Sequence, residues 1–168
     1  FRYFLIYNIL KDHLIVFLKV IYSILIFFKL NKLPSKKQLD DLLKYYKSGN
    51  DEKTYKLALS LTKEFPHDTF AWKILSAYYK KIGKILDSLT AIQKIVNLSP
   101  NDAFAYYNLG NTFKDLKRYT EAKESYKKAI SLKPDFVEAI YNLGITFREL
   151  EQFLEAEEAY KKVIILKP

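Results

Sequence analysis

The sequence is poor in the residues that most often define the chemistry of a small protein. None of its 168 residues is cysteine or methionine, and only four are glycine and five are proline. Without cysteine there is no disulfide, no thiolate metal site and no cysteine nucleophile. So few glycines and prolines argue against a collagen-like chain, a flexible linker protein and a turn-rich β-sandwich. The two histidines, His13 and His67, are too few for an all-histidine metal centre, and we expect no metal and no cofactor.

What is present suits a globular protein, because 49% of the residues are hydrophobic and 28% are charged. The formal net charge of +9 is spread along the chain, and residues 137–168 are net negative. Proteins that bind nucleic acids usually gather Lys and Arg on one face, so we expect no nucleic-acid partner. The sequence contains no Met and begins at Phe1, and we expect it to be a fragment of a longer chain.

The few prolines and glycines recur at a fixed spacing. The prolines that follow Pro34 stand 34 residues apart, at positions 66, 100, 134 and 168. Every glycine also has a partner 34 residues away: Gly49 with Gly83, and Gly110 with Gly144. A constant period of this length indicates stacked supersecondary units. We divide the chain into a degenerate unit at 35–68 and clear units at 69–102, 103–136 and 137–168. Because no polar capping helix follows, we expect the array to be truncated at its end.

Each unit is predicted to contain two helices. In the unit 103–136, apolar or small residues stand at i, i+3, i+4 and i+7 in a first stretch and at i, i+4, i+7 and i+8 in a second, and both are the spacing of one helix face. The first stretch contains Tyr106, Leu109, Gly110 and Phe113, and the second contains Ala122, Tyr126, Ala129 and Ile130. We expect the small Gly110 and Ala122 to let the two antiparallel helices approach closely, with the large aromatic side chains filling the space around them.

These units resemble the tetratricopeptide repeat, whose 34-residue pattern has a large residue, Leu-Gly and an aromatic residue in its first helix. Its second helix has Ala, an aromatic residue, Ala and Pro. The unit 103–136 matches this pattern at Tyr106, Leu109, Gly110, Phe113, Ala122, Tyr126, Ala129 and Pro134. In the unit 69–102, Ser76 and Ser88 stand where Gly and Ala are usual. The resemblance extends to the repeat arms of bacterial tetratricopeptide repeat proteins and of O-linked N-acetylglucosamine transferases. It implies an all-α fold, a right-handed α-solenoid of antiparallel helix pairs.

The resemblance also implies a concave groove that is lined by the first helix of each unit and binds a protein or peptide ligand. Carried over to this sequence, the groove residues are Phe70, Lys73, Ile74, Ala77, Phe104, Tyr107, Asn108, Asn111, Tyr141, Asn142 and Ile145. A basic edge is expected from Lys80, Lys81, Lys114 and Arg148. An Asn amide can both donate to and accept from a peptide group, and Asn108 and Asn142 resemble two rungs of an asparagine ladder. The alternative is that both Asn side chains cap turns or face water.

A second binding mode of the family, the carboxylate clamp for acidic chaperone tails, is incomplete in this chain. Lys73 and Asn108 stand at matching positions, but Ala77, Glu138 and Asn142 stand where Asn, Lys and Arg are needed. We therefore expect no strong binding to an acidic C-terminal tail.

No catalytic motif is present. The isolated glycines cannot form a phosphate-binding loop, and nothing matches a P-loop or an H-E-x-x-H metal motif. The cluster Glu155, Glu157 and Glu158 is interpreted as the solvated face of an amphipathic helix. We predict a non-catalytic scaffold for protein interactions. The alternative is the substrate-recruiting arm of a larger glycosyltransferase or sulfotransferase whose catalytic domain lies outside this sequence.

Residues 1–33 form a hydrophobic segment that is predicted to be helical and lacks the repeat. Its densest part, 14–28, contains Lys19 and as a helix would measure roughly 22 Å, against about 30 Å of membrane hydrocarbon. Three interpretations stay open: a membrane anchor, a hydrophobic cap on the first repeat, or the translation of AT-rich upstream DNA. If the segment spans a membrane, the lysines that follow it place the repeats in the cytoplasm.

Overall fold

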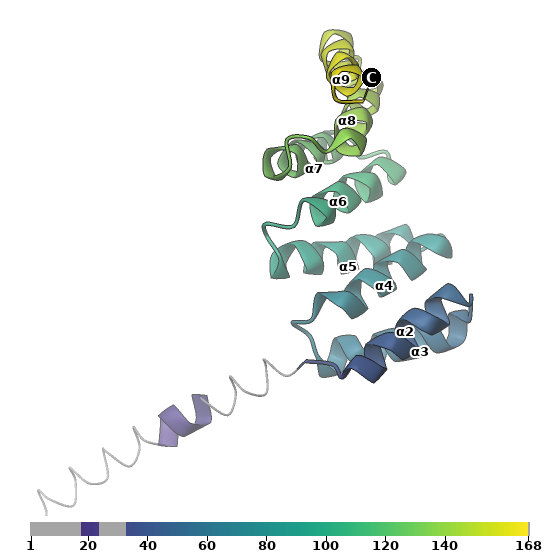
Figure 1. Cartoon of the computed structure of the whole chain (residues 1–168), viewed down its shortest axis with the longest axis vertical. Coiled ribbons are helices and arrows are strands. Elements are labelled where there is room, and N and C mark those ends of the chain that lie inside the picture. The colour runs from purple at the N-terminus through teal and green to yellow at the C-terminus, as the bar shows by residue number, and fades with distance from the viewer. Residues whose placement is uncertain (1–17, 24–32, 168) are drawn as a thin grey trace, which may run out of the picture.

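The repeats fold into a stack of helical hairpins. The structure, a computed structural model, describes residues 18–23 and 33–167. Its eight helices after Leu33 are α2 (Lys36–Lys47), α3 (Asp51–Glu64), α4 (Thr69–Lys81), α5 (Ile85–Leu98), α6 (Ala103–Asp115), α7 (Tyr119–Leu132), α8 (Val137–Glu149) and α9 (Phe153–Leu166). They pair as α2/α3, α4/α5, α6/α7 and α8/α9, and the pairs lie one above the other from α2 to α9 (Figure 1). This arrangement confirms the predicted fold class, an all-α solenoid of antiparallel helix pairs.

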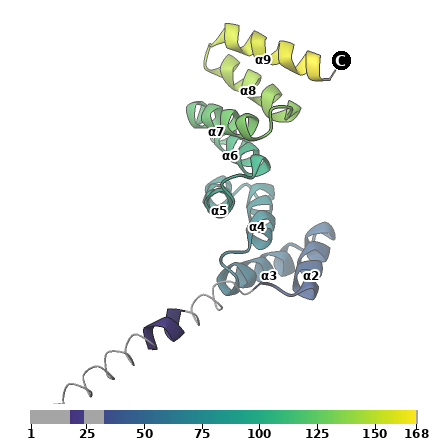
Figure 2. The ribbon, with the colours of Figure 1, turned by 60° about the vertical axis from the view of Figure 1, so that its left-hand side comes forward.

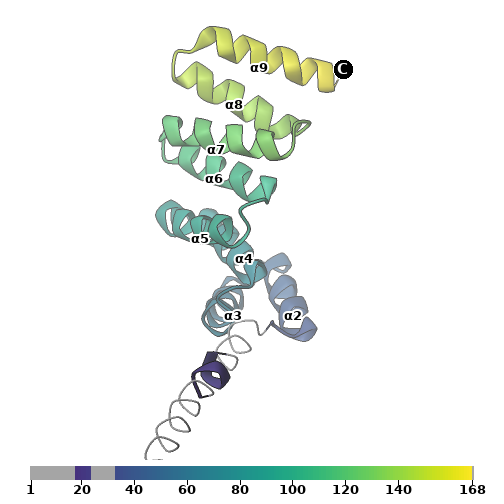
Figure 3. The ribbon, with the colours of Figure 1, turned by 90° about the vertical axis from the view of Figure 1, so that its left-hand side faces the viewer.

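Each helix packs against the next helix along the chain, so the core is a continuous strip rather than one central cluster. The first helices of neighbouring hairpins also approach each other, but unequally. The backbones of α2 and α4, and those of α6 and α8, come within 8 Å between Cα atoms, whereas those of α4 and α6 do not. The turned views in Figures 2 and 3 show the hairpins following one another as successive layers.

Local sequence signals set the helix boundaries. Ser35 forms a capping box with Gln38 at the start of α2, and Asp68 and Asp102 accept hydrogen bonds from backbone N–H groups at the starts of α4 and α6. Each proline between hairpins follows the last residue of a second helix by two positions, where it cannot continue the helix.

The turn inside every hairpin contains one residue in the left-handed region. The φ angles are +70° at Gly49, +74° at Gly83, +57° at Lys117 and +58° at Glu151. These four positions are 34 residues apart, so the repeat requires the conformation even where glycine is absent. A side chain in this region costs roughly 1 kcal/mol or more, because its Cβ crowds the backbone.

The two helices of each hairpin have residues of complementary size at one pair of repeat positions. In the third hairpin, a Cβ added to Gly110 would lie 2.6 Å from Cε1 of Tyr126, and Gly144 and Tyr160 show the same 2.6 Å approach in the fourth. The equivalent pair is Ser76 and Ile92 in α4/α5, and Leu42 and Ala58 in α2/α3. The size of the residue on the first helix therefore falls as that of its partner rises.

The hydrophobic segment before Leu33 is described over one short helical stretch. Residues 18–23 are helical, and the side chains of Leu18, Val20 and Tyr22 are about half exposed or more. The other residues of the predicted anchor or cap lie outside the described part of the chain. Among the helices that the structure describes, none is both long and apolar enough to cross a membrane.

The first prediction concerns the left-handed turn residues. We expect Gly83→Ala to lower the free energy of unfolding by about 1 kcal/mol, and Lys117→Gly to raise it by up to about 1 kcal/mol. Both positions are exposed, and a Cβ on Gly83 has no neighbour within 4 Å, so backbone strain is the main effect. Urea denaturation followed by circular dichroism measures both changes. Equal stability of Gly83→Ala and the unmodified protein would contradict the strain at this turn.

The second prediction concerns the complementary pair in α6/α7. We expect Gly110→Ser to cost about 1–3 kcal/mol, because the ring of the fully buried Tyr126 cannot retreat from the new side chain. Adding Tyr126→Ile recreates the Ser–Ile pair of α4/α5, and the double variant should be more stable than the sum of the single changes predicts, by about 1 kcal/mol. A double-mutant cycle in urea tests this, and strictly additive values would refute the complementarity.

Candidate functional site

The predicted groove residues come from α4, α6 and α8, the first helices of three successive hairpins. Their side chains are exposed at Lys73, Phe104, Asn108 and Tyr141, and half-buried at Phe70, Ala77, Tyr107, Asn111, Asn142 and Ile145. The expectation for Ile74 is wrong. Ile74 is only 8% exposed and belongs to the core between the first two hairpins, because it lies on the side of α4 that faces α2 and α3.

Three of these residues are joined in a polar network between α6, α7 and α8. The Asn142 amide nitrogen donates to Asn111 Oδ1 at 3.2 Å and to the Tyr107 hydroxyl at 3.3 Å. Lys114 Nζ donates to Asn142 Oδ1 at 3.1 Å. Both ends of the Asn142 amide are therefore used within the protein. This side chain neither caps a turn nor simply faces water, which are the roles of the alternative interpretation.

The phenol of Tyr126 completes this network from α7. Its hydroxyl donates to Asn111 Oδ1 at 2.7 Å, and its ring fills the space above Gly110. Tyr126 is fully buried, and burial raises the pKa of its hydroxyl well above the ordinary value. The hydroxyl therefore stays protonated and remains a hydrogen-bond donor. The ring belongs to the same hydrophobic cluster as Leu143 and Phe147 of α8.

Asn108 stands one repeat earlier than Asn142 but in a different environment. The structure gives its side-chain amide no hydrogen-bond partner, and the residue is exposed in the middle of α6. The difference lies in the neighbouring hairpin, where Lys73 and Ala77 occupy the positions of Tyr107 and Asn111. Neither of them bonds to Asn108, so its amide is available to a ligand.

A cavity of about 140 Å³ lies next to Asn108, between α4, α5 and α6. It is lined by Lys73, Ser76, Ala77, Lys80, Ser88, Ile92, Asn108 and Thr112. The two serine hydroxyls at its floor lie 3.0 Å apart, and Ser88 Oγ also approaches the Ser76 carbonyl oxygen at 3.0 Å. Each serine thus has a partner for its hydroxyl, so the floor of the cavity is polar but already satisfied.

Two ion pairs span the same interface at opposite ends of α6. Lys73 Nζ lies 3.0 Å from Asp102 Oδ2, and Lys80 Nζ lies 2.8 Å from Asp115 Oδ2. Partial burial opposes ionisation of Asp102, but hydrogen bonds from Lys73 and from the Ala105 N–H outweigh it, and the pKa of Asp102 is lowered. Both lysines next to the cavity therefore have an acidic partner.

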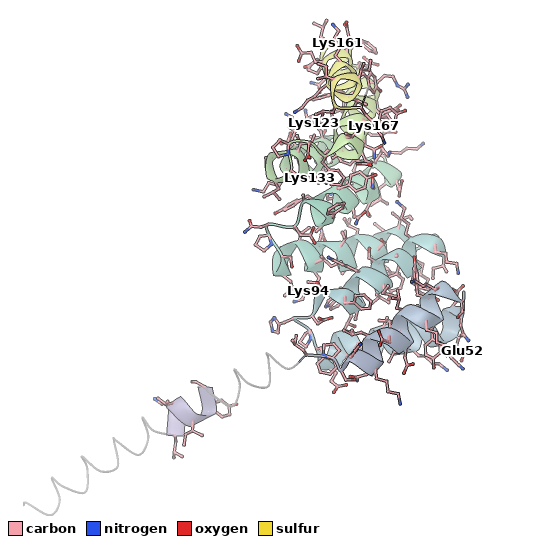
Figure 4. The ribbon with its side chains drawn as sticks, viewed as in Figure 1. Glu52, Lys94, Lys123, Lys133, Lys161 and Lys167 are labelled. Atoms are coloured by element: carbon pink, nitrogen blue, oxygen red, sulfur yellow. The ribbon has the colours of Figure 1, made fainter. Side chains whose placement is uncertain are left out.

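The expected basic edge is also largely paired. Lys81 lies 2.7 Å from Asp51, Lys114 donates to Asn142, and Arg148 lies 3.4 Å from Glu149. Figure 4 shows other lysines, among them Lys94, Lys123 and Lys161, at different levels of the stack rather than in one patch. Half-exposed pairs of this kind contribute little to stability, but they reduce the positive potential that an acidic ligand would meet.

An aromatic cluster borders the face of α6. The ring of Phe136, which precedes α8, lies 4.8 Å from that of Phe104 and 4.9 Å from that of Tyr107 between centroids. Lys133, labelled in Figure 4, lies 5.0 Å from the ring centroid of Phe136 and 5.2 Å from that of Phe104. Phe104 is nevertheless 55% exposed, and Tyr141 on α8 is 50% exposed. Two large rings are thus presented to solvent on this face.

Sequence reasoning missed the residues of α5 and the loop before α8. Ile92 of α5 lines the cavity, although the predicted groove residues all belong to the first helix of a unit. A signal was available, since Ile92 aligns with Tyr126 and Tyr160 one and two repeats later. Phe136 aligns with the capping residues Asp68 and Asp102, and the change from Asp to Phe is the only sequence signal that distinguishes this position.

Within residues 18–23 and 33–167, no group of three or more His, Asp or Glu side chains could hold a metal ion.

The chain is similar to tetratricopeptide repeat proteins in sequence pattern and in fold. Residues 103–136 and 125–158 match family models described as tetratricopeptide repeat. A crystal structure of MamA aligns with 25% identity and a TM-score of 0.72, covering 77% of this chain and 78% of that one. MamA 41-end from Desulfovibrio magneticus RS-1 aligns with 22% identity and a TM-score of 0.72, covering 77% and 73%. No curated protein matches at the level of sequence.

The network predicts that two asparagines at the same repeat position differ in their effect on stability. We expect Asn142→Ala to lower the free energy of unfolding by about 1–2 kcal/mol, because Lys114 and Tyr107 lose a half-buried partner. Asn108→Ala should be neutral or slightly stabilising, because Ala is the better helix former. Urea denaturation of the two variants checks this, and equal effects would show that the network does not distinguish the two positions.

Proposed function

Because this chain is a tetratricopeptide repeat protein, we propose that it binds an extended peptide segment along the face formed by α4, α6 and α8. Proteins built from such repeats are scaffolds for protein interactions, and the partner is accordingly a protein or peptide. We propose that binding is the whole activity of this chain, without catalysis.

The observation that carries the proposal is the unpartnered amide of Asn108. It lies at the centre of the face, in the middle of the middle helix, and is exposed. A primary amide offers a donor and an acceptor side by side, which is the pattern that one peptide group presents in return. Asn at a helix interior has lower helix propensity than Ala, so the position suits contact with a ligand better than support of the helix.

Of the two asparagines in the predicted ladder, only Asn108 has a side-chain amide that is free to bind a ligand. Asn142 is held by Lys114, Asn111 and Tyr107, and it would have to break these hydrogen bonds before it could bind a peptide group. We therefore propose that Asn108 grips the ligand backbone, whereas Asn142 fixes the geometry of the α6/α8 side of the groove.

Exposed aromatic side chains supply the apolar contact area. Phe104 stands near the start of α6 and Tyr141 near the start of α8, each about half exposed. Aromatic rings of this kind are enriched in protein interfaces, because they bury a large area at a low cost in conformational entropy. A segment that crosses from α4 to α8 would lay apolar side chains on both rings while its backbone meets Asn108.

The charges of the groove favour a ligand without strong acidity. Lys73 and Lys80 each have an acidic partner, and Lys114 is engaged by Asn142. A carboxylate would have to compete with Asp102 or Asp115 for its lysine. This agrees with the incomplete carboxylate clamp, and we propose that recognition rests on the peptide backbone and apolar side chains.

The proposal is tested with peptides selected from a displayed library of random linear sequences. We expect Asn108→Ala to weaken the affinity of a selected peptide roughly tenfold, since two hydrogen bonds of about 0.5–1.5 kcal/mol each are lost. Isothermal titration calorimetry measures the affinity. The matched control is Asn97→Ala, which removes an exposed asparagine of α5 outside the predicted groove. Unchanged affinity in Asn108→Ala, or an equal loss in both variants, would contradict binding at this face.

A further inference from the structure

Two successive interfaces of the stack differ at equivalent positions. In the third hairpin, the ring of Tyr126 rests on Gly110 and its hydroxyl donates to Asn111, which also accepts a hydrogen bond from Asn142 of the fourth hairpin. Between the second and third hairpins, the same three positions hold Ile92, Ser76 and Ala77. The residues that face them are alike in the two interfaces: Asn108 and Thr112 in one, Asn142 and Thr146 in the other.

The exchange of Tyr for Ile leaves an open cavity. Its volume is about 140 Å³, and a cavity of about 150 Å³ in a protein core is enough to admit benzene. The cavity is therefore of the size of one aromatic ring. Ser76 carries a Cβ where Gly110 has none, so a guest ring would lie nearer to the mouth of the cavity than Tyr126 lies in its own interface.

The surrounding contacts keep this interface wider than the next one. The backbones of α6 and α8 come within 8 Å of each other between Cα atoms, and those of α4 and α6 do not. The pairs Lys73–Asp102 and Lys80–Asp115 join α4 to the two ends of α6, and no such pair reaches Asn108 between them. Asn108 stands in the middle of that helix, with a free amide at the edge of the cavity.

We propose that this cavity binds the phenol side chain of a tyrosine supplied by the bound segment. The ring packs on Ile92 and Ala77, and its hydroxyl exchanges a hydrogen bond with the amide of Asn108. The guest thus repeats, between proteins, the arrangement that Tyr126 and Asn111 make within the chain. The inference rests on the proposed function, because it names the side chain that anchors the extended segment in the groove.

The chemistry of the walls favours a phenol over an anion or a purely apolar group. An anion would need an ammonium group, and Lys73 and Lys80 already have carboxylate partners at 3.0 Å and 2.8 Å. A ring without a hydroxyl would bury the Asn108 amide against carbon, which costs free energy unless the amide finds a hydrogen-bond partner. Only a group that is both flat and apolar and carries a hydroxyl satisfies the walls and the amide together.

The experiment uses p-cresol as the probe, with toluene and inorganic phosphate as comparisons. In NMR titrations of the whole 168-residue chain, p-cresol should shift the Asn108 side-chain amide signals in a saturable manner, with little effect on those of Asn142. Toluene should bind at least threefold more weakly, and phosphate should leave the Asn108 signals in place. Preferential binding of phosphate, or equal binding of toluene, would overturn the assignment to a phenol.

A variant that copies the closed interface provides the decisive control. Ser76→Gly, Ala77→Asn and Ile92→Tyr together install the residues that the next repeat has at the same positions, so the fold already accommodates this combination. We expect the triple variant to lose p-cresol binding at least tenfold while keeping its helical circular dichroism. If it does not fold, Ala77→Leu alone narrows the mouth from a half-buried position and should weaken binding as well. Undiminished binding in a folded variant would overturn the proposal.

The peptides selected for the groove separate this inference from the proposed function. If Asn108→Ala weakens peptide binding but the triple variant and replacement of the peptide's tyrosines do not, the groove is correct and the tyrosine site is wrong. If p-cresol binds at Asn108 while no linear peptide is retained, the cavity assignment stands and the proposed function fails.

Discussion

The contact between one residue of the first helix and one of the second determines how each hairpin closes. At the same two repeat positions, Leu42 is combined with Ala58, Ser76 with Ile92 and Gly110 with Tyr126, so a small residue on one helix goes with a larger one on the other. Because protein interiors pack as densely as organic crystals, the two partners cannot grow together. Where the second helix contributes a tyrosine, its hydroxyl donates to Asn111 within the same hairpin, and Asn111 in turn accepts a hydrogen bond from Asn142 of the next one. Where it contributes an isoleucine, the interface with the next hairpin remains open.

The same repeat position therefore carries different roles at Asn108 and Asn142. The side chain and its place on the helix are identical, but Asn142 meets Asn111 and Tyr107, whereas Asn108 meets Ala77 and Lys73. One amide becomes part of the framework and the other stays free. The residues of the preceding hairpin determine whether the Asn amide is free. An assignment that gives equivalent positions of two repeats the same function therefore misses this distinction.

The fold could be predicted from the sequence because it depends on periodic, local signals. The 34-residue spacing of proline and glycine and the helical spacing of Leu109, Gly110 and Phe113 each report on nearby backbone. The site was predicted only in part, since helix periodicity alone did not separate the buried Ile74 from the exposed Lys73. The cavity and the network depend on which side chains meet across hairpins, as Lys114 meets Asn142. Comparing the repeats with one another, rather than with a consensus, would have revealed the exchange of Tyr126 for Ile92.

The ion pairs that flank the cavity have a mechanical consequence. In a solenoid each unit contacts only its neighbours, so each joint between two hairpins depends on its own local contacts. Between the second and third hairpins, the ion pairs Lys73–Asp102 and Lys80–Asp115 join α4 to α6, and the backbone of α5 packs against that of α6. Dissolved salt screens half-exposed charges but not buried rings. Added salt therefore weakens this joint more than the next one, where the buried ring of Tyr126 belongs to the shared core.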